Sequence, residues 1–339
     1  MDDVNPPKFG IARTDEVTEL PSVRKLQRSD GITWATTLAQ VLADTFGAPE
    51  GVTENLEHVS NLVSLLLDEV RLHPLPSFVV HARPKGSFTI NPVFFAATMA
   101  SHRAERLIQA VELAAGALDA LESGALQLSA VAARALFELA VVCEDLHQPM
   151  LEPWRKIHGS VARVHAAANS ANCETFNLVW TVRNGTRYYP DDHGWEHATS
   201  VLSRLDRFSK RYTAARDIYD MLCDATHPNI ESHATLWRTQ YADIGEVHGI
   251  RFEPGRSNSK IKLYIVEAIR LSLSMIIPFL RDLWWVAADV TNMCNVTPND
   301  HTVLLGLPAR AKRNELCSCN SGQVTRVCTH PEPEGLFKQ

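Results

Sequence analysis

The stretch Ala130–His147, AVAARALFELAVVCEDLH, decides the fold that we expect for this chain. It is apolar on nearly every side, which is typical of a helix in the core of a helical protein. Arg134 and Glu138 are spaced i and i+4, so they share one face of that helix, and Asp145 follows two turns later. An unpaired buried charge is very costly, so these groups are expected either to pair with each other or to serve a functional site.

The composition of the whole chain is that of a soluble globular protein. Its 339 residues are 45% hydrophobic and 21% charged, which is enough for one large domain or two ordinary ones. The net charge of −6 argues against non-specific coating of nucleic acid, although a local basic patch could still bind RNA. The opening MDDVNPPKFG lacks an apolar stretch, so we expect no secretory signal. Pro278 and Arg281 interrupt the apolar run Leu271–Val290, which predicts a core helix rather than a membrane span.

Helical spacing of apolar residues recurs along most of the chain and predicts an all-α protein. The expected fold is a multi-helix bundle with minor β-hairpins and a small C-terminal zinc knuckle. Helices are expected at Ile32–Phe46, at Leu56–Leu72, from Pro92 to about Leu121 with Gly124 just past the end, through Ala130–His147 to a stop at Pro149, at Leu151–Asn169, at Trp195–Thr226 and at Ser259–Cys294. Hairpins are expected within Phe78–Ile90 and around Gly245 or Gly249.

The tail carries a set of metal-ligand residues: Cys317, Cys319, Cys328 and His330. Zinc is bound tetrahedrally by such Cys₃His sets, and binding would supply the folding energy of a segment too short for a core. A disulfide is the alternative, and it is disfavoured because nothing in the sequence indicates export. Four protein ligands leave no open position for water, so the site would be structural rather than catalytic.

The tail also resembles the SEC-C motif, a zinc knuckle with the form Cys-x-Cys, eight residues, Cys, then Cys or His. Asn320-Ser321-Gly322 stands where that family has Gly-Ser-Gly, and His330 lies one residue later than the usual fourth ligand. The resemblance implies a zinc-stabilised module that binds a protein or RNA partner.

A second resemblance covers roughly Ser101–Asn292. The segments RALFELAVVCEDL and YDMLCDATHPN look like helical domains similar to the HEPN superfamily, in which an Arg-x₃-Glu helix packs near a later helix ending in His-Pro. Many HEPN proteins are metal-independent ribonucleases with an Arg-x₄₋₆-His motif, which is matched literally here only by Arg187 and His193. The resemblance implies a ribonuclease in stress response or phage defence, and a homodimer.

A candidate catalytic set follows from the residues themselves. Tyr219, Cys223 and His227 are spaced i, i+4 and i+8 at the end of a predicted helix, where the helix dipole favours a charged imidazole. If Arg134 and Glu138 face this end, then Arg134, Glu138, His227 and Tyr219 could hold a phosphate and move a proton. Alternatively, Glu138 only neutralises Arg134, and His227 caps its own helix.

Two functions therefore remain open. One is a cytoplasmic helical scaffold or regulatory protein that docks a partner through the zinc knuckle, and the other is a HEPN-like ribonuclease. We divide the chain into an N-terminal helical region with a hairpin at 1–92, a HEPN-like bundle at 93–295, a linker at 296–313 and the knuckle at 314–332.

Overall fold

The computed structural model describes residues 50–73, 75, 92–157, 199–227, 235–245, 247–257 and 259–293. Within them the chain forms helices and one pair of strands. The elements are α4 (Glu50–Leu72), α5 (Pro92–Glu122), α6 (Leu126–Ile157), α9 (Val201–Ser209), α10 (Ala215–Thr226), β1 (Trp237–Ile244), β2 (Val247–Ser257) and α12 (Ser259–Met293).

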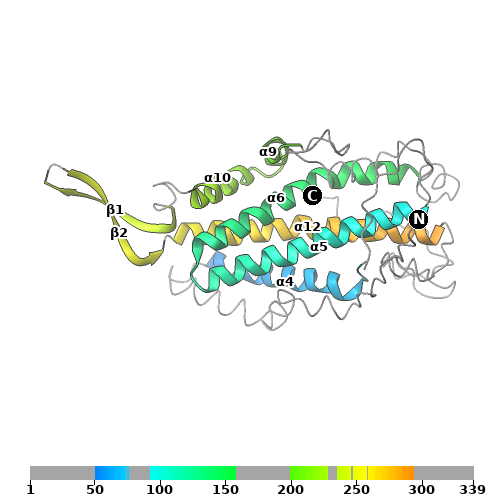
Figure 1. Ribbon diagram of the computed structural model, residues 1–339, viewed down its shortest axis with the longest axis horizontal. Coiled ribbons are helices and arrows are strands. Elements are labelled where there is room, and N and C mark those ends of the chain that lie inside the picture. Colours follow the sequence, from blue (N-terminus) through cyan, green and yellow to red (C-terminus); the bar gives the residue numbers. More distant parts are fainter. Residues whose placement is uncertain are drawn as a thin grey trace, which may run out of the picture.

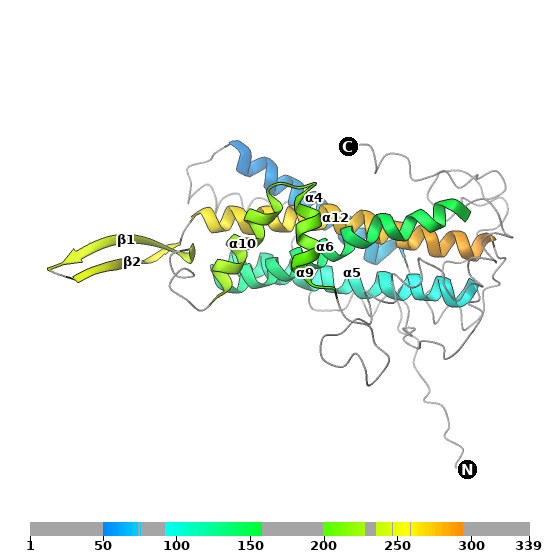
Figure 2. The same cartoon turned by 90° about the horizontal axis from the view of Figure 1, so that it is seen from above.

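Four long helices, α4, α5, α6 and α12, lie side by side and form the body of the molecule (Figure 1). The shorter helices α9 and α10 pack on the outer side of α6 (Figure 2). Helices α6 and α12 run in the same direction, and α5 runs against both. The described part of the chain is therefore largely α-helical, as the sequence predicts.

The core fills the space between these four helices and extends under α10. Its largest fully buried side chains include Phe137 of α6 and Phe279 of α12, and small alanines line much of α5. Alanines let neighbouring helices approach closely, while the large side chains fill the space between them. The nearly continuous apolar character of Ala130–His147 has a plain cause: α5, α12, α9 and α10 all pack on α6.

The turn between α5 and α6 is built as the sequence predicts. Helix α5 begins at Pro92, whose missing N–H costs nothing in the first turn, and it ends at Glu122. Gly124 has φ +76°, a left-handed conformation that favours glycine after a helix end. The N–H of Ala125 donates to the carbonyl of Ala120 (2.8 Å), which satisfies one of the last free carbonyls of α5.

Two predicted helix boundaries are wrong. Helix α6 does not stop at Pro149 but continues to Ile157, and Pro149 lies on its exposed side. A proline removes one hydrogen bond from a helix interior, and here the helix continues through that loss.

The predicted single helix Trp195–Thr226 is broken in its described part into α9 and α10. The chain turns after Ser209, with the N–H groups of Arg211 and Tyr212 both donating to the carbonyl of Phe208 (3.0 and 3.1 Å). The break brings the rings of Phe208 and Tyr212 to within 4.6 Å and lets Arg211 pair with Glu144 of α6 (2.8 Å). Apolar spacing continues across the break, so it gave no sign of the turn.

Strands β1 and β2 pair antiparallel and form a narrow ribbon that projects from one end of the helical body (Figure 1). Gly245 follows β1 with φ +65°, a left-handed conformation that suits a tight reversal of the chain. The register is regular from Thr239 opposite Phe252 to Ile244 opposite Val247, and an irregularity separates Thr239 from Trp237. Helix α12 starts soon after β2 ends.

By length and composition alone, Leu126–Met150 in α6 and Lys260–Thr291 in α12 are apolar enough to cross a membrane. More than half of each stretch is buried within the protein, as in the core helices of soluble proteins, and α12 carries the buried charges Asp282 and Asp289. The predicted elements Ile32–Phe46, Phe78–Ile90 and most of Leu151–Asn169 lie outside the described residues.

Candidate functional site

The seam between α6 and α10 holds three of the four residues that the sequence nominated for catalysis. Arg134 Nε donates to Glu138 Oε1 (3.0 Å), and Arg134 Nη2 donates to the Tyr219 hydroxyl (3.4 Å). The Tyr219 hydroxyl in turn donates to Glu138 Oε1 (3.2 Å). The guanidinium also lies over the Tyr219 ring, 5.4 Å from its centroid, in cation–π geometry. Arg134, Glu138 and Tyr219 therefore form one closed hydrogen-bonded set.

The fourth contact of this set is Thr226, which the sequence reasoning missed. Arg134 Nη1 donates to the Thr226 hydroxyl (3.1 Å), and that hydroxyl donates to the carbonyl of Cys223 (3.0 Å). The available signal was a threonine in the last turn of a helix, where its hydroxyl commonly bonds back to the preceding turn.

His227 is not joined to the set. It is exposed and stands at the C-cap of α10 with φ −77° and ψ 138°, where its backbone N–H donates to the carbonyl of Cys223 (3.0 Å). Among the described residues, no hydrogen bond or ion pair links its ring to Arg134 or Glu138. The i, i+4, i+8 spacing keeps residues on one face only while the helix continues, and α10 ends at Thr226. The extended backbone of His227 therefore takes it out of the row.

The Arg134–Glu138 pair is more open than the apolar sequence around it suggested. The two side chains are 30% and 33% exposed, because the pair lies at the edge of the seam rather than between α6 and the central helices. Our expectation of a fully buried pair is therefore not met.

The electrostatics of the set favour structure over reactivity. Partial burial works to lower the pKa of Arg134, but the hydrogen bond with Tyr219 and the neighbouring acidic groups raise it above its ordinary value. Burial raises the pKa of the Tyr219 hydroxyl, and the hydrogen bond from Arg134 offsets this only in part. The pKa of the Cys223 thiol is also raised, chiefly by burial, although Arg134 opposes the shift. At neutral pH the set thus holds a charged guanidinium, a neutral phenol and a neutral thiol.

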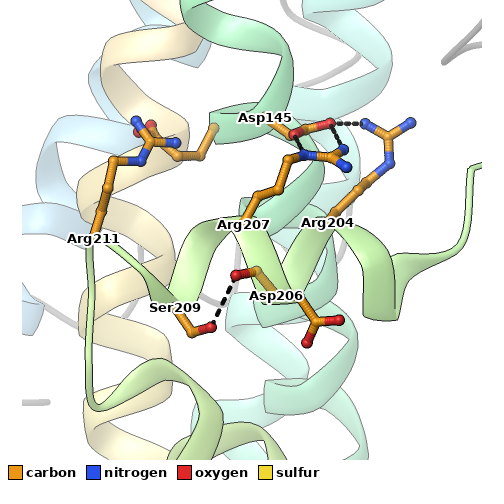
Figure 3. A network of polar contacts seen from close by, with 7 residues as sticks. Asp145, Arg204, Asp206, Arg207, Ser209 and Arg211 are labelled. Atoms are coloured by element: carbon orange, nitrogen blue, oxygen red, sulfur yellow. Dashed lines mark hydrogen bonds and ion pairs between the residues drawn. The ribbon is translucent and has the colours of Figure 1, made fainter.

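Asp145, the third charge of the predicted stripe, serves a different contact. Its carboxylate accepts hydrogen bonds from Arg204 Nη1 (2.6 Å) and from Nε and Nη2 of Arg207 (2.8 and 2.9 Å), as Figure 3 shows. The neighbouring Glu144 pairs with Arg211 (2.8 Å). These contacts fasten α9 across α6, and the arginines that make them were not singled out in the sequence.

Two further polar clusters lie inside the four-helix body. His147 Nε2 and Asp282 Oδ2 are 2.6 Å apart in the core between α6 and α12. At Glu69, Oε2 accepts from Arg103 Nη2 (3.1 Å), and Oε1 accepts from Arg281 Nε (2.8 Å). Both clusters join different helices, and the polar side chains that make them are buried except that of Arg281.

The predicted zinc ligands Cys317, Cys319, Cys328 and His330 lie outside the described residues, as do Arg187 and His193. Within the part of the chain that the structure describes, no group of three or more His, Cys, Asp or Glu residues is arranged to hold a metal ion.

Comparison with known protein families, curated proteins and solved structures finds no match to this chain. The two family resemblances noted in the sequence therefore stay predictions.

Proposed function

We propose that this protein is a cytoplasmic helical scaffold or regulatory protein that docks a protein or RNA partner through a C-terminal zinc knuckle. The knuckle would hold one structural zinc ion with Cys317, Cys319, Cys328 and His330, the set whose spacing resembles the SEC-C motif.

One observation about the helical body supports this proposal. At the α6–α10 seam, Glu138 accepts hydrogen bonds from both Arg134 and Tyr219, and Arg134 uses Nε, Nη1 and Nη2 within the protein. A general base needs a lone pair directed at its substrate, and a phosphate-binding arginine needs free donors. These groups instead hold α10 against α6, which is the work of a scaffold.

Zinc content tests the knuckle directly. Purified wild-type protein should contain about one zinc per chain, and the Cys317→Ser/Cys319→Ser variant should lose it. The unfolding of the helical body should be unchanged in that variant, because the tail is proposed to fold separately around its metal. Equal zinc content in the two proteins would contradict the proposal.

A HEPN-like, metal-independent ribonuclease of stress response or phage defence is the second candidate. The observation in its favour is that Arg134 is partly exposed at the seam and contacts Thr226, the residue directly before the exposed His227. A substrate phosphate would have to displace Tyr219 or Thr226 from Arg134 to reach the guanidinium.

Incubation with a mixed RNA pool in the presence of EDTA separates the two candidates. A scaffold leaves the RNA intact. A ribonuclease of the proposed kind cleaves it, and both Arg134→Gln and His227→Ala abolish cleavage while circular dichroism shows an unchanged fold. Asp224→Asn is a matched control, because Asp224 is exposed one turn before His227 and belongs to neither candidate set.

A further inference from the structure

The ribbon formed by β1 and β2 has little support from its own protomer. It extends away from the helical body in both views (Figures 1 and 2), and among the described elements each strand packs extensively only on the other. A two-stranded ribbon is marginally stable in water unless a further strand or another surface packs on it. The fold therefore presents an element that a partner surface would stabilise.

One face of this ribbon is the apolar one by position. The register sets Thr239 opposite Phe252 and Tyr241 opposite Ile250. Directly paired residues lie on the same face of an antiparallel pair, and residues two apart along a strand share that face. These four positions therefore alternate with the more polar pair Gln240–Arg251 on the other face.

The helical body exposes apolar side chains at the end from which the ribbon projects. We define the ribbon-end patch as Leu128 and Val131 of α6, Leu263 of α12 and Trp237 at the base of β1. These side chains are 62%, 47%, 37% and 37% exposed, respectively.

The two helices of this patch are aligned. Helices α6 and α12 are parallel neighbours, and His147 of one contacts Asp282 of the other. Leu128 and Leu263 precede these two contact residues by the same number of positions, so they lie at the same level near the starts of both helices. The apolar side chains thus gather around the root of the ribbon.

We propose that a second copy of this chain covers both features, with the ribbon of each protomer packed on the ribbon-end patch of the other. A two-fold axis at this end buries two ribbons and two patches together, and the contact is closed and self-complementary. The regular part of the ribbon, about 20 Å long at some 3.3 Å per residue, can span two helices packed about 10 Å apart. A different partner would have to match the ribbon and the patch with one surface, whereas a second copy supplies both.

This proposal concerns the helical body and is independent of the zinc knuckle. Sedimentation velocity of the full-length protein over a range of concentrations provides the test. Wild type should be a dimer at micromolar concentration. Replacing Thr239–Phe252 with a short Gly-Ser turn should give monomers, as should Leu128→Glu/Leu263→Glu. Leu65→Glu on α4 is the control, since Leu65 is as exposed as Leu263 but lies outside the patch, and this variant should stay dimeric.

Mixing the two defective proteins sharpens the result. The ribbon-deleted protein keeps its patch and the patch variant keeps its ribbon, so one of the two contacts can form between them. The mixture should associate more weakly than wild type, whereas neither variant should associate alone. A monomeric wild type, a dimer that survives both changes, or a mixture that stays monomeric would each overturn the proposal. Because the substituted leucines are solvent-exposed, the patch variant should keep its helical circular dichroism even if ribbon deletion disturbs the fold.

Discussion

Two arginine–glutamate clusters in this protein look alike in composition but differ in their surroundings. Around Glu69, the side chains of Glu69 and Arg103 are 3% and 1% exposed and lie between α4, α5 and α12. At the α6–α10 seam, Glu138 and Arg134 are 33% and 30% exposed. The same chemical pair is thus enclosed in the core in one region and reaches solvent in the other. The difference teaches that exposure, rather than the presence of a pair, decides what breaking it costs.

The buried cluster should show the largest effect. In Glu69→Gln, Arg103 keeps its charge in a dry environment without its carboxylate, and burial already lowers the pKa of this guanidinium. We expect the free energy of unfolding to fall by about 3–5 kcal/mol, measured by urea denaturation.

Asp68→Asn is the matched control for this prediction. Asp68 is the adjacent residue, its side chain is 48% exposed and its pair with Arg71 spans 3.9 Å, so its loss should cost less than about 0.5 kcal/mol. Equal effects of the two substitutions would show that burial does not separate the clusters.

The contact between α6 and α9 should lie in between. Asp145→Asn weakens charge-assisted hydrogen bonds to the nearly buried Arg204 and to Arg207, and we expect a loss of about 2 kcal/mol in thermal unfolding. Asp206→Asn serves for comparison, because its pair with Arg216 is exposed on both sides and should contribute almost nothing. A larger effect at Asp206 than at Asp145 would contradict this ranking.

The seam pair should give a smaller value than its apolar sequence context implied. A fully buried pair would lose about 3–5 kcal/mol in Glu138→Ala. With both side chains about one-third exposed, and with Tyr219 and Thr226 still available to Arg134, we expect about 1 kcal/mol. A double-mutant cycle with Tyr219→Phe measures the coupling through the shared oxygen of Glu138. A coupling near zero would mean that the two hydrogen bonds act independently.

Much of the fold was predictable because helices leave periodic signals in the sequence. The start of α5 at Pro92, its end before Gly124 and the long final helix follow from apolar spacing and terminal residues. The break between α9 and α10 was not predictable, because apolar residues keep their spacing across it. What breaks the helix is the tertiary contact of Arg211 with Glu144, a residue distant in sequence.

The candidate site was predictable in part for a related reason. Arg134 and Glu138 pair within one helix, which spacing alone predicts, and Tyr219 joins them from the helix that the sequence nominated. His227 was placed by extending helical geometry one residue beyond the true end of α10. The buried contacts Arg103–Glu69 and His147–Asp282 join residues far apart in the chain, and no local pattern marks them.

The smallest expected effect concerns the two described thiols, which again differ by exposure. Cys143 is fully buried in α6, and burial raises its pKa to about 12, so it should resist alkylation in the native protein at any pH where the fold persists. Cys223 is only partly buried at the seam. Burial raises its pKa while Arg134 lowers it, with a net upward shift. Because the thiolate is the reactive form, alkylation of Cys223 by iodoacetamide should be slow at pH 7 and should accelerate at a higher pH than for an unperturbed thiol. In Arg134→Gln the opposing charge is removed, so the profile should move to still higher pH; the shift should be modest because solvent reaches this region. Peptide-resolved mass spectrometry of the alkylated protein separates the two cysteines from the others in the chain. A shift to lower pH in the variant would show that Arg134 does not stabilise the Cys223 thiolate, and that it lies farther from the thiol than the seam geometry requires.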